Sequence, residues 1–217
     1  MTDTTAHHEP VEHIGRVGVV PVVTITDPHH AVALADALVT GGLSAIEITL
    51  RTPAGLEAIR RTAASGSDRV VGAGSVRSVN EAEAALDAGA RFLVSPGLDR
   101  QIVATAQDAS IPIIPGIATA TELMQAVDLG LGVVKVFPAE ATGGVANVAA
   151  LAAVFPHVRF MPTGGITPEN ATAYLRRTEV LAIGGSWMVP SNALADGDWR
   201  SITAAAIAAV DLVTAAR

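Results

Sequence analysis

Short apolar runs alternate with longer amphipathic runs along nearly the whole chain. The apolar runs are rich in valine and isoleucine, which is typical of buried β-strands. Eight such runs occur, at residues 17–25, 44–50, 69–74, 91–96, 111–116, 132–138, 158–164 and 180–186. The runs between them are rich in alanine, leucine and glutamate at helical spacing, and a final one covers about residues 198–215. The pattern predicts a strand followed by a helix, repeated eight times.

Capping signals mark several of the predicted helices. The stretches "TPAGLE", "SVNEAE" and "TPEN" each place a Ser or Thr ahead of a helical run, where its side chain can accept a hydrogen bond from a free backbone N–H. Gly41, Gly89 and Gly130 lie at the ends of three of the helical runs, as glycine commonly does at helix C-termini. These signals separate each predicted helix from the next strand.

Strands that are apolar on both faces and separated by helices predict a parallel sheet covered on both sides. Eight strand–helix units match an α/β protein with a compact (β/α)₈ TIM barrel, and a doubly wound open sheet is the alternative. We expect residues 16–217 to form a single barrel domain. The polar residues 1–15 are expected to be a disordered N-terminal extension.

Composition narrows the partners and the chemistry. The net charge is −7 with a pI near 5.3, which argues against a nucleic-acid or anionic-membrane surface. The chain has no cysteine, so disulfides, thiolate nucleophiles and cysteine-ligated metals are excluded. The start lacks the features of a signal peptide, and the alanine-rich run near the C-terminus is interrupted by Asp211. We therefore expect a soluble, cytoplasmic protein.

Lys135 stands out because it is the only lysine beside 13 arginines and lies inside an apolar run. Alternate residues of a strand face the same way, so Val133, Lys135 and Phe137 share one face, predicted to point into the barrel. A snorkelling or ion-paired lysine is one interpretation. The other is a nucleophile, since a buried lysine can lose its proton whereas an arginine stays charged. A neutral amine suits attack on a carbonyl to form a Schiff base without a metal.

The same rule places Glu47, Thr49 and Arg51 on one inward face. An internal Glu47–Arg51 ion pair is one possibility. The functional interpretation makes Glu47 a general acid/base near Lys135, and makes Arg51 a fork for a substrate carboxylate.

Two glycine corners, "TGGITPEN" and "IGGSWMVP", follow the seventh and eighth predicted strands. Glycine lets the backbone approach an anion closely, and the loops after these two strands often bind phosphate in (β/α)₈ barrels. The six histidines form no evident ligand set, so neither a metal nor a cofactor is expected.

Seven collinear motifs carry a resemblance to a known family. "EITLRT", "GAGSV", "SPGL", "IPGIAT", "KVFPAE", "PTGGI" and "IGGSWMVP" resemble the aldolases that cleave 2-keto-3-deoxy-6-phosphogluconate (KDPG) and, in many members, 4-hydroxy-2-oxoglutarate (KHG). The likeness extends from about residue 17 to 210. It implies a class I aldolase on a compact (β/α)₈ barrel, commonly a homotrimer, that takes a small 2-keto acid.

The resemblance also implies roles for individual residues. Lys135 matches the Schiff-base lysine, Glu47 the general acid/base and Arg51 the carboxylate-binding arginine. Further residues are implied to bind the substrate or its phosphate. The substrate-binding positions are Ser75, Pro96, Phe137 and Thr163, and the phosphate-contacting positions are Gly164, Gly165, Gly185 and Ser186.

Two departures from the family pattern affect substrate choice. Many members have threonine where this chain has Ser75, so the hydroxyl is retained and a methyl group is lost. The first strand, "VVPVVTITD", lacks the basic residue that the family often has near the phosphate. A phosphosugar isomerase and a non-catalytic phosphometabolite-binding protein remain as alternatives from other functional classes.

Overall fold

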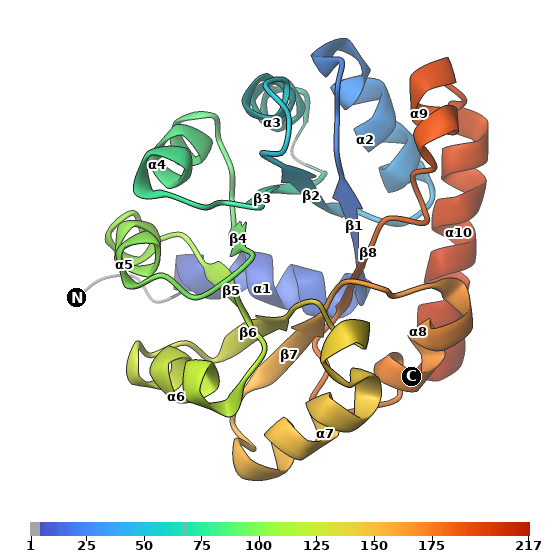
Figure 1. Cartoon of the computed structure of the whole chain (residues 1–217). Helices are drawn as coiled ribbons and strands as arrows, with labels where there is room; N and C mark the ends of the chain where they lie inside the picture. The colour runs from blue at the N-terminus through green and yellow to red at the C-terminus, as the bar shows by residue number, and fades with distance from the viewer. Residues whose placement is uncertain (1–4, 67) are drawn as a thin grey trace.

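The computed structural model describes residues 5–66 and 68–217, and its centre is one parallel sheet of eight strands. The strands are hydrogen-bonded in the order β7-β6-β5-β4-β3-β2-β1-β8, so sequence neighbours are also neighbours in space. Figure 1 shows the helices arranged around them. The strands are β1 (Val19–Val23), β2 (Ala45–Thr49), β3 (Val70–Gly74), β4 (Leu93–Ser95), β5 (Ile113–Ile117), β6 (Val133–Val136), β7 (Arg159–Pro162) and β8 (Ile183–Gly185).

The first and last strands of this order close on each other. Parallel bridges join Phe160 to Val180 and Thr163 to Gly184, one toward each end of β7. The sheet is therefore a barrel, as the eight-unit pattern predicts, and the doubly wound open sheet is excluded. Each of the eight predicted strands overlaps an observed strand, which is shorter than predicted by one to four residues.

The helices follow the strands as predicted and form the outer layer. Ser78 caps its helix by accepting a bond from the N–H of Glu81, and Thr167 forms a capping box with Asn170. Thr52 does not cap, because its hydroxyl donates to the Ile25 carbonyl and the helix begins later. The covering helices are α2 (Ala31–Thr40), α3 (Gly55–Ala64), α4 (Val79–Asp87), α5 (Arg100–Asp108), α6 (Ala120–Asp128), α7 (Gly144–Val154), α8 (Pro168–Leu175) and α10 (Trp199–Ala216).

Three further helical segments were not predicted: α1 (Thr5–Val17), α9 (Ser191–Asp196) and the 3₁₀ turn η2 (Glu140–Thr142). The 3₁₀ turn η1 (Pro28–His30) begins the predicted helical run at residues 27–42. The helix α1 corrects the expectation of a disordered segment at residues 1–15, of which residues 1–4 lie outside the described residues. The sequence of α1 is mostly polar, but Val11, Ile14 and Val17 form one apolar face of the helix.

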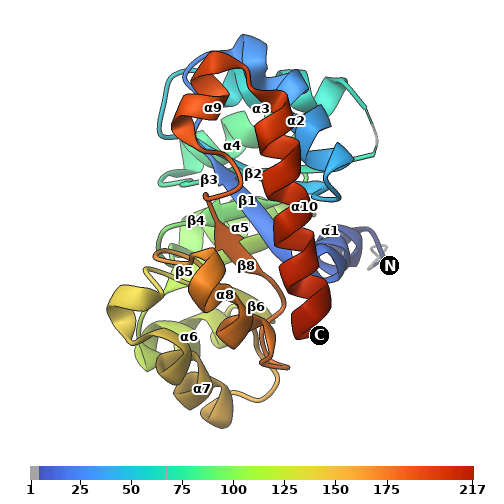
Figure 2. The ribbon, with the colours of Figure 1, turned by 90° about the vertical axis from the view of Figure 1, so that its right-hand side faces the viewer.

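This face of α1 closes one end of the barrel. Ile14 is fully buried in a cluster with inward-facing residues such as Met161 of β7 and Phe92, which directly precedes β4. The His13 Nε2 atom lies 2.8 Å from the Ser44 hydroxyl at the start of the second strand unit. Figure 2 shows α1 at the opposite end of the barrel from α9. Residues 11–17 thus pack against the barrel, which the mostly polar sequence of this segment does not indicate.

The last helix, α10, is long and apolar enough to cross a membrane by length and composition. Its buried residues Ile202, Ala206, Ala209 and Val213 recur at helical spacing and form one stripe. The helix packs on α2, α8 and α9, which agrees with the expected terminal helix of the barrel layer.

Side-chain direction alternates along the strands and divides the core in two. Val134 and Val136 pack in the cluster shared with the surrounding helices. Val133 instead packs against the inner cluster, which also contains Val20 and Ile114. The inner cluster fills the N-terminal half of the barrel, so polar inward-facing residues are confined to the C-terminal half.

Replacing Ile14 by alanine should lower the free energy of unfolding by about 2–5 kcal/mol, because it leaves a cavity under the inner cluster. Urea unfolding followed by circular dichroism measures the change. Glu12→Ala, at an exposed position of the same helix, is the control and should change stability by less than about 0.5 kcal/mol. Equal stability of Ile14→Ala and wild type would mean that α1 does not close the barrel.

Candidate functional site

A lysine and a glutamate meet inside the barrel from opposite walls. Lys135 comes from β6 and Glu47 from β2, four strands away in an eight-stranded barrel. The Lys135 Nζ atom lies 3.5 Å from Glu47 Oε1. The lysine side chain is 3% exposed and the glutamate side chain 0% exposed. The inward direction predicted for both residues from strand alternation is thus the observed one.

Glycines provide the space that this pair occupies. A Cβ atom on Gly74 would lie 2.1 Å from Glu47 Oε1, so only glycine at this position leaves room for the carboxylate. Lys135 pairs in register with Gly116, where an added Cβ would lie 2.2 Å from the Pro96 carbonyl oxygen. The absence of a side chain at Gly116 therefore brings the exposed loop at Pro96 close to the strand that carries Lys135.

One carboxylate oxygen of the pair is free to accept a bond. Glu47 Oε2 is buried and has no hydrogen-bond partner among the described residues. Buried polar atoms are nearly always hydrogen-bonded, so this oxygen marks a position for a hydroxyl group or a water molecule. The Phe137 ring lies beside the same site, with its centroid 5.1 Å from the Lys135 ammonium.

Arg51 follows β2 and is held toward the pocket by Ser75. Its Nε donates to the Ser75 hydroxyl at 2.9 Å, which leaves the end of the guanidinium available. Ser75 has φ = 58°, a left-handed conformation that is uncommon outside glycine. The proposed Glu47–Arg51 ion pair is wrong, because Glu47 pairs with Lys135 and Arg51 binds Ser75. Thr49, the third residue predicted to face inward on this strand, is hydrogen-bonded to Thr24, with 2.9 Å between their hydroxyl oxygens.

The two predicted glycine corners lie next to each other. Gly164 and Gly165 have φ values of 97° and 80°, which glycine adopts without strain. Thr163 and Gly184 form the bridge that closes the barrel, and a Cβ on Gly184 would lie 2.4 Å from the Thr163 hydroxyl oxygen. The corners after β7 and β8 therefore meet at the seam of the barrel.

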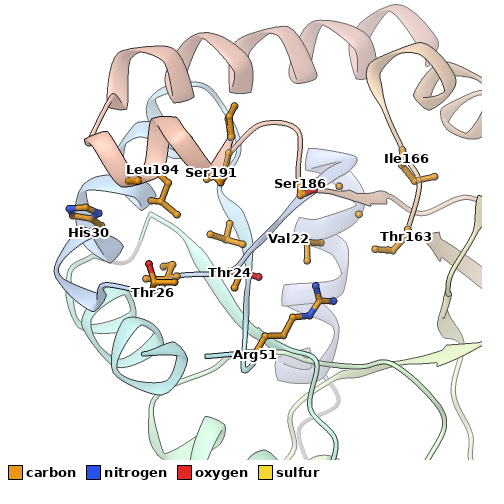
Figure 3. A pocket seen from close by; sticks show the side chains of 18 of the residues that line it. Val22, Thr24, Thr26, His30, Arg51, Thr163, Ile166, Ser186, Ser191 and Leu194 are labelled. Atoms are coloured by element: carbon orange, nitrogen blue, oxygen red, sulfur yellow. The ribbon is translucent and has the colours of Figure 1, made fainter. Parts of the chain in front are cut away.

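A pocket of about 760 Å³ opens at this end of the barrel. Figure 3 shows Thr163, Ile166 and Ser186 on one side of it, and the guanidinium of Arg51 extending into its middle. Lys135 and Glu47 are deeper and do not form its wall; Phe137 links the two regions. The predicted residues that line the pocket are Arg51, Phe137, Thr163, Gly164, Gly165, Gly185 and Ser186.

Part of the pocket wall was not predicted. The far side is formed by residues that follow β1 and by the short helix α9. The polar residues after the first strand were a usable signal, since chemistry collects at strand C-termini in this fold. The helix α9 is six residues long and gave no periodic signal. These unpredicted residues include Thr24, Thr26, Asp27, His30, Ser191 and Leu194.

Within residues 5–66 and 68–217, no group of three or more His, Cys, Asp or Glu side chains is placed to hold a metal ion. His30 lies edge-on to the Trp199 ring, with 5.4 Å between the ring centroids. Burial, followed by the nearby Arg16 charge, lowers the pKa of His13.

The fold and the site together define a (β/α)₈-barrel protein with a buried lysine–carboxylate pair beneath a pocket at the C-terminal ends of its strands, where enzymes of this fold have their active sites. Residues 11–205 match the family described as KDPG and KHG aldolase. The KHG/KDPG aldolase of Escherichia coli K12 is 47% identical over 193 residues, which cover 89% of this chain and 91% of that protein. The chain therefore belongs to the KDPG/KHG aldolase family.

Solved structures agree with this assignment. The KDPG aldolase of Zymomonas mobilis ZM4 with 3-phosphoglycerate superposes with a TM-score of 0.88 at 42% identity, covering 95% of this chain and 97% of that one. The Legionella pneumophila enzyme, with pyruvate captured at low pH as a covalent carbinolamine intermediate, has a TM-score of 0.89 at 39% identity. That match covers 92% of this chain and 97% of the other.

Ser75→Gly should be more stable than Ser75→Ala by about 1 kcal/mol, because both lose the hydroxyl but only glycine adopts the left-handed conformation without strain. Urea unfolding of the two variants measures the difference. If Ser75→Ala equals or exceeds Ser75→Gly in stability, the backbone at residue 75 is not strained.

Proposed function

We propose that this protein is a class I aldolase that cleaves KDPG to pyruvate and glyceraldehyde 3-phosphate, and KHG to pyruvate and glyoxylate. The observation that carries the proposal is the buried contact between Lys135 and Glu47 at the C-terminal end of the barrel. An amine enclosed with one carboxylate can react with a carbonyl, and the carboxylate can move the protons that the reaction requires. Membership of the family and the carbinolamine held by the Legionella enzyme support it.

In the first half of the reaction, Lys135 gives a proton to Glu47, and its neutral amine attacks C2 of the 2-keto acid. Glu47 moves protons so that the carbinolamine loses water and becomes an iminium ion. The free Glu47 Oε2 supports this role, since it can accept a bond from a water molecule or a hydroxyl group. Arg51 binds the substrate carboxylate through the guanidinium nitrogens that do not contact Ser75.

In the second half, Glu47 takes the proton from the C4 hydroxyl and the C3–C4 bond breaks. The electrons of that bond move into the iminium, which becomes an enamine as the aldehyde leaves. Protonation of the enamine and hydrolysis then release pyruvate and restore the amine. Phe137 and Pro96 are proposed to pack against the pyruvyl group, and Thr163 to bind the substrate nearby.

The glycine corners are proposed to hold the phosphate of the longer substrate. Gly164, Gly165, Gly185 and Ser186 line the pocket together, and their backbones are open to close approach. No arginine or lysine comes from β1 or the residues up to His30, so the phosphate would be held mainly by neutral donors. This feature supports use of KHG beside KDPG.

The assembly is proposed from the family resemblance, and the location from the composition of the sequence. We propose a homotrimer in the cytoplasm, with no nucleic acid or membrane as partner and no metal or cofactor in the reaction. The acidic net charge of −7 supports the absence of a polyanionic partner.

Borohydride added with pyruvate should fix one pyruvyl group on wild-type protein, because reduction of the imine makes the bond permanent. Intact-protein mass spectrometry measures the adduct, and peptide mapping should place it on Lys135, the only lysine. Lys135→Arg should form no adduct and show no cleavage, since a guanidinium does not make the imine.

A matched control keeps the number of lysines at one but moves the lysine to another position. Lys135→Arg combined with Arg176→Lys places the single lysine on the exposed end of α8 and should also give no adduct above background. An isomerase or a non-catalytic binding protein would leave wild type unlabelled. Near-normal cleavage by Lys135→Arg would contradict the imine mechanism.

Glu47→Gln should reduce kcat about 10²–10⁴-fold while the protein stays folded, because the amide keeps the shape but cannot carry a proton. Steady-state cleavage of KDPG, coupled to pyruvate detection, measures the loss. Glu83→Gln, at an exposed position on α4, should retain wild-type turnover. Turnover of Glu47→Gln within a few-fold of wild type would remove Glu47 from the proton transfers.

A further inference from the structure

The loop after the lysine strand is hydrogen-bonded to the first glycine corner. The N–H groups of Ala139 and Glu140 donate to the carbonyls of Thr163 and Gly164, at 2.8 and 3.1 Å. These two bonds join the segments that directly follow β6 and β7, beyond the ends of both strands. Glu140 thus lies five residues after Lys135 and directly beside the proposed phosphate site.

Side chains of the loop after β6 pack closely against the Gly164–Gly165 corner. A Cβ atom on Gly165 would lie 2.7 Å from both Cβ and Cγ of Glu140. A Cβ on Gly164 would lie 3.3 Å from carbon atoms of the Phe137 ring. The backbone of Gly164 and Gly165 therefore packs against residues 137–140. A shift of the Glu140 side chain would change the position of this corner.

Tyr174 fixes the position of Glu140. Its ring comes from α8 and is completely buried, and its hydroxyl donates to Glu140 Oε1. A buried tyrosine hydroxyl needs a partner, and a carboxylate is a strong one. Burial, then the hydrogen bond to Glu140 and the charge of that carboxylate, raise the pKa of Tyr174 above its usual range. The tyrosine therefore remains a donor at physiological pH.

We propose that Glu140 and Tyr174 are positioning residues that hold the Gly164–Gly165 corner at a set distance from Lys135, and so determine how well the phosphorylated substrate is bound. The hydrogen bond between Tyr174 and Glu140 connects helix α8 to the loop after β6, and that loop contacts the corner after β7. Neither residue is proposed to touch a reacting atom, because both act through the position of the corner. The inference rests on the proposed function, because it assigns the corner to the substrate phosphate.

The kinetic test compares two substrates that differ in the phosphate. Tyr174→Phe should raise KM for KDPG about fivefold to tenfold, the loss typical of one misplaced hydrogen-bonding site, and leave kcat within about twofold. The values of kcat and KM for KHG, and the rate of pyruvate trapping by borohydride, should stay unchanged. Glu140→Ala should have the same signature, and Glu140→Gln should restore most of the KDPG affinity because it keeps the acceptor and the methylene groups.

Glu169→Gln on the first turn of α8 is the control and should have wild-type constants for both substrates. Equal losses on KDPG and KHG, or unchanged KM for KDPG in both Tyr174→Phe and Glu140→Ala, would overturn the positioning role. If wild-type protein neither traps pyruvate nor cleaves either substrate, the proposed function is wrong. The proposed kinetic role of the Tyr174–Glu140 contact is then wrong as well.

A spectroscopic readout reports the contact without any substrate. Tyr174 is the only tyrosine, so the tyrosinate absorbance of the folded protein reports this one hydroxyl. It should ionise above the ordinary tyrosine pKa of about 10, and Glu140→Gln should lower that value because the carboxylate charge is lost. An ordinary pKa in the wild-type protein would show that Tyr174 does not donate to Glu140 in solution.

Discussion

The site depends on placing one ammonium and one carboxylate together inside a closed barrel. Either charge alone in that interior would be destabilised by several kcal/mol through loss of water, and the pair survives because Lys135 and Glu47 approach from opposite walls. An eight-stranded barrel is only wide enough for side chains to fill it. The carboxylate of Glu47 therefore requires a neighbour without a side chain, which explains Gly74 in the adjacent strand β3. Gly116 has a different cause, since a side chain there would meet the Pro96 backbone.

The strand order follows from the repeated strand–helix unit, and the inward direction of the charged residues follows from the period of two in a strand. Val133 packs inward and Val134 outward, as strand alternation requires, so the direction of Lys135 is fixed by its neighbours. Long amphipathic runs identify the covering helices because one face of each is buried at a period of 3.6 residues. The fold is predictable wherever burial imposes a regular spacing on the residues.

The features that were not predicted depend on contacts between distant segments. Helix α1 is polar along most of its length, and only the inner cluster that Ile14 completes explains its order. Thr52 has the spacing of a cap, but the Ile25 carbonyl competes for its hydroxyl. Arg51 binds Ser75 rather than Glu47, which no spacing within "EITLR" could indicate. The Tyr174–Glu140 bond links residues 34 positions apart, and its only sequence signal was a lone tyrosine in a helix.

The seam of the barrel coincides with the candidate anion site. The strands β7 and β8, at the two ends of the strand order, join at the Thr163–Gly184 bridge, and the glycine corners begin at those same residues. A ligand that binds both corners spans the closure and binds only the closed barrel. Each tenfold rise of such a ligand above its dissociation constant then adds about 1.4 kcal/mol to folding stability. Binding at the proposed phosphate site would therefore protect the folded barrel against unfolding.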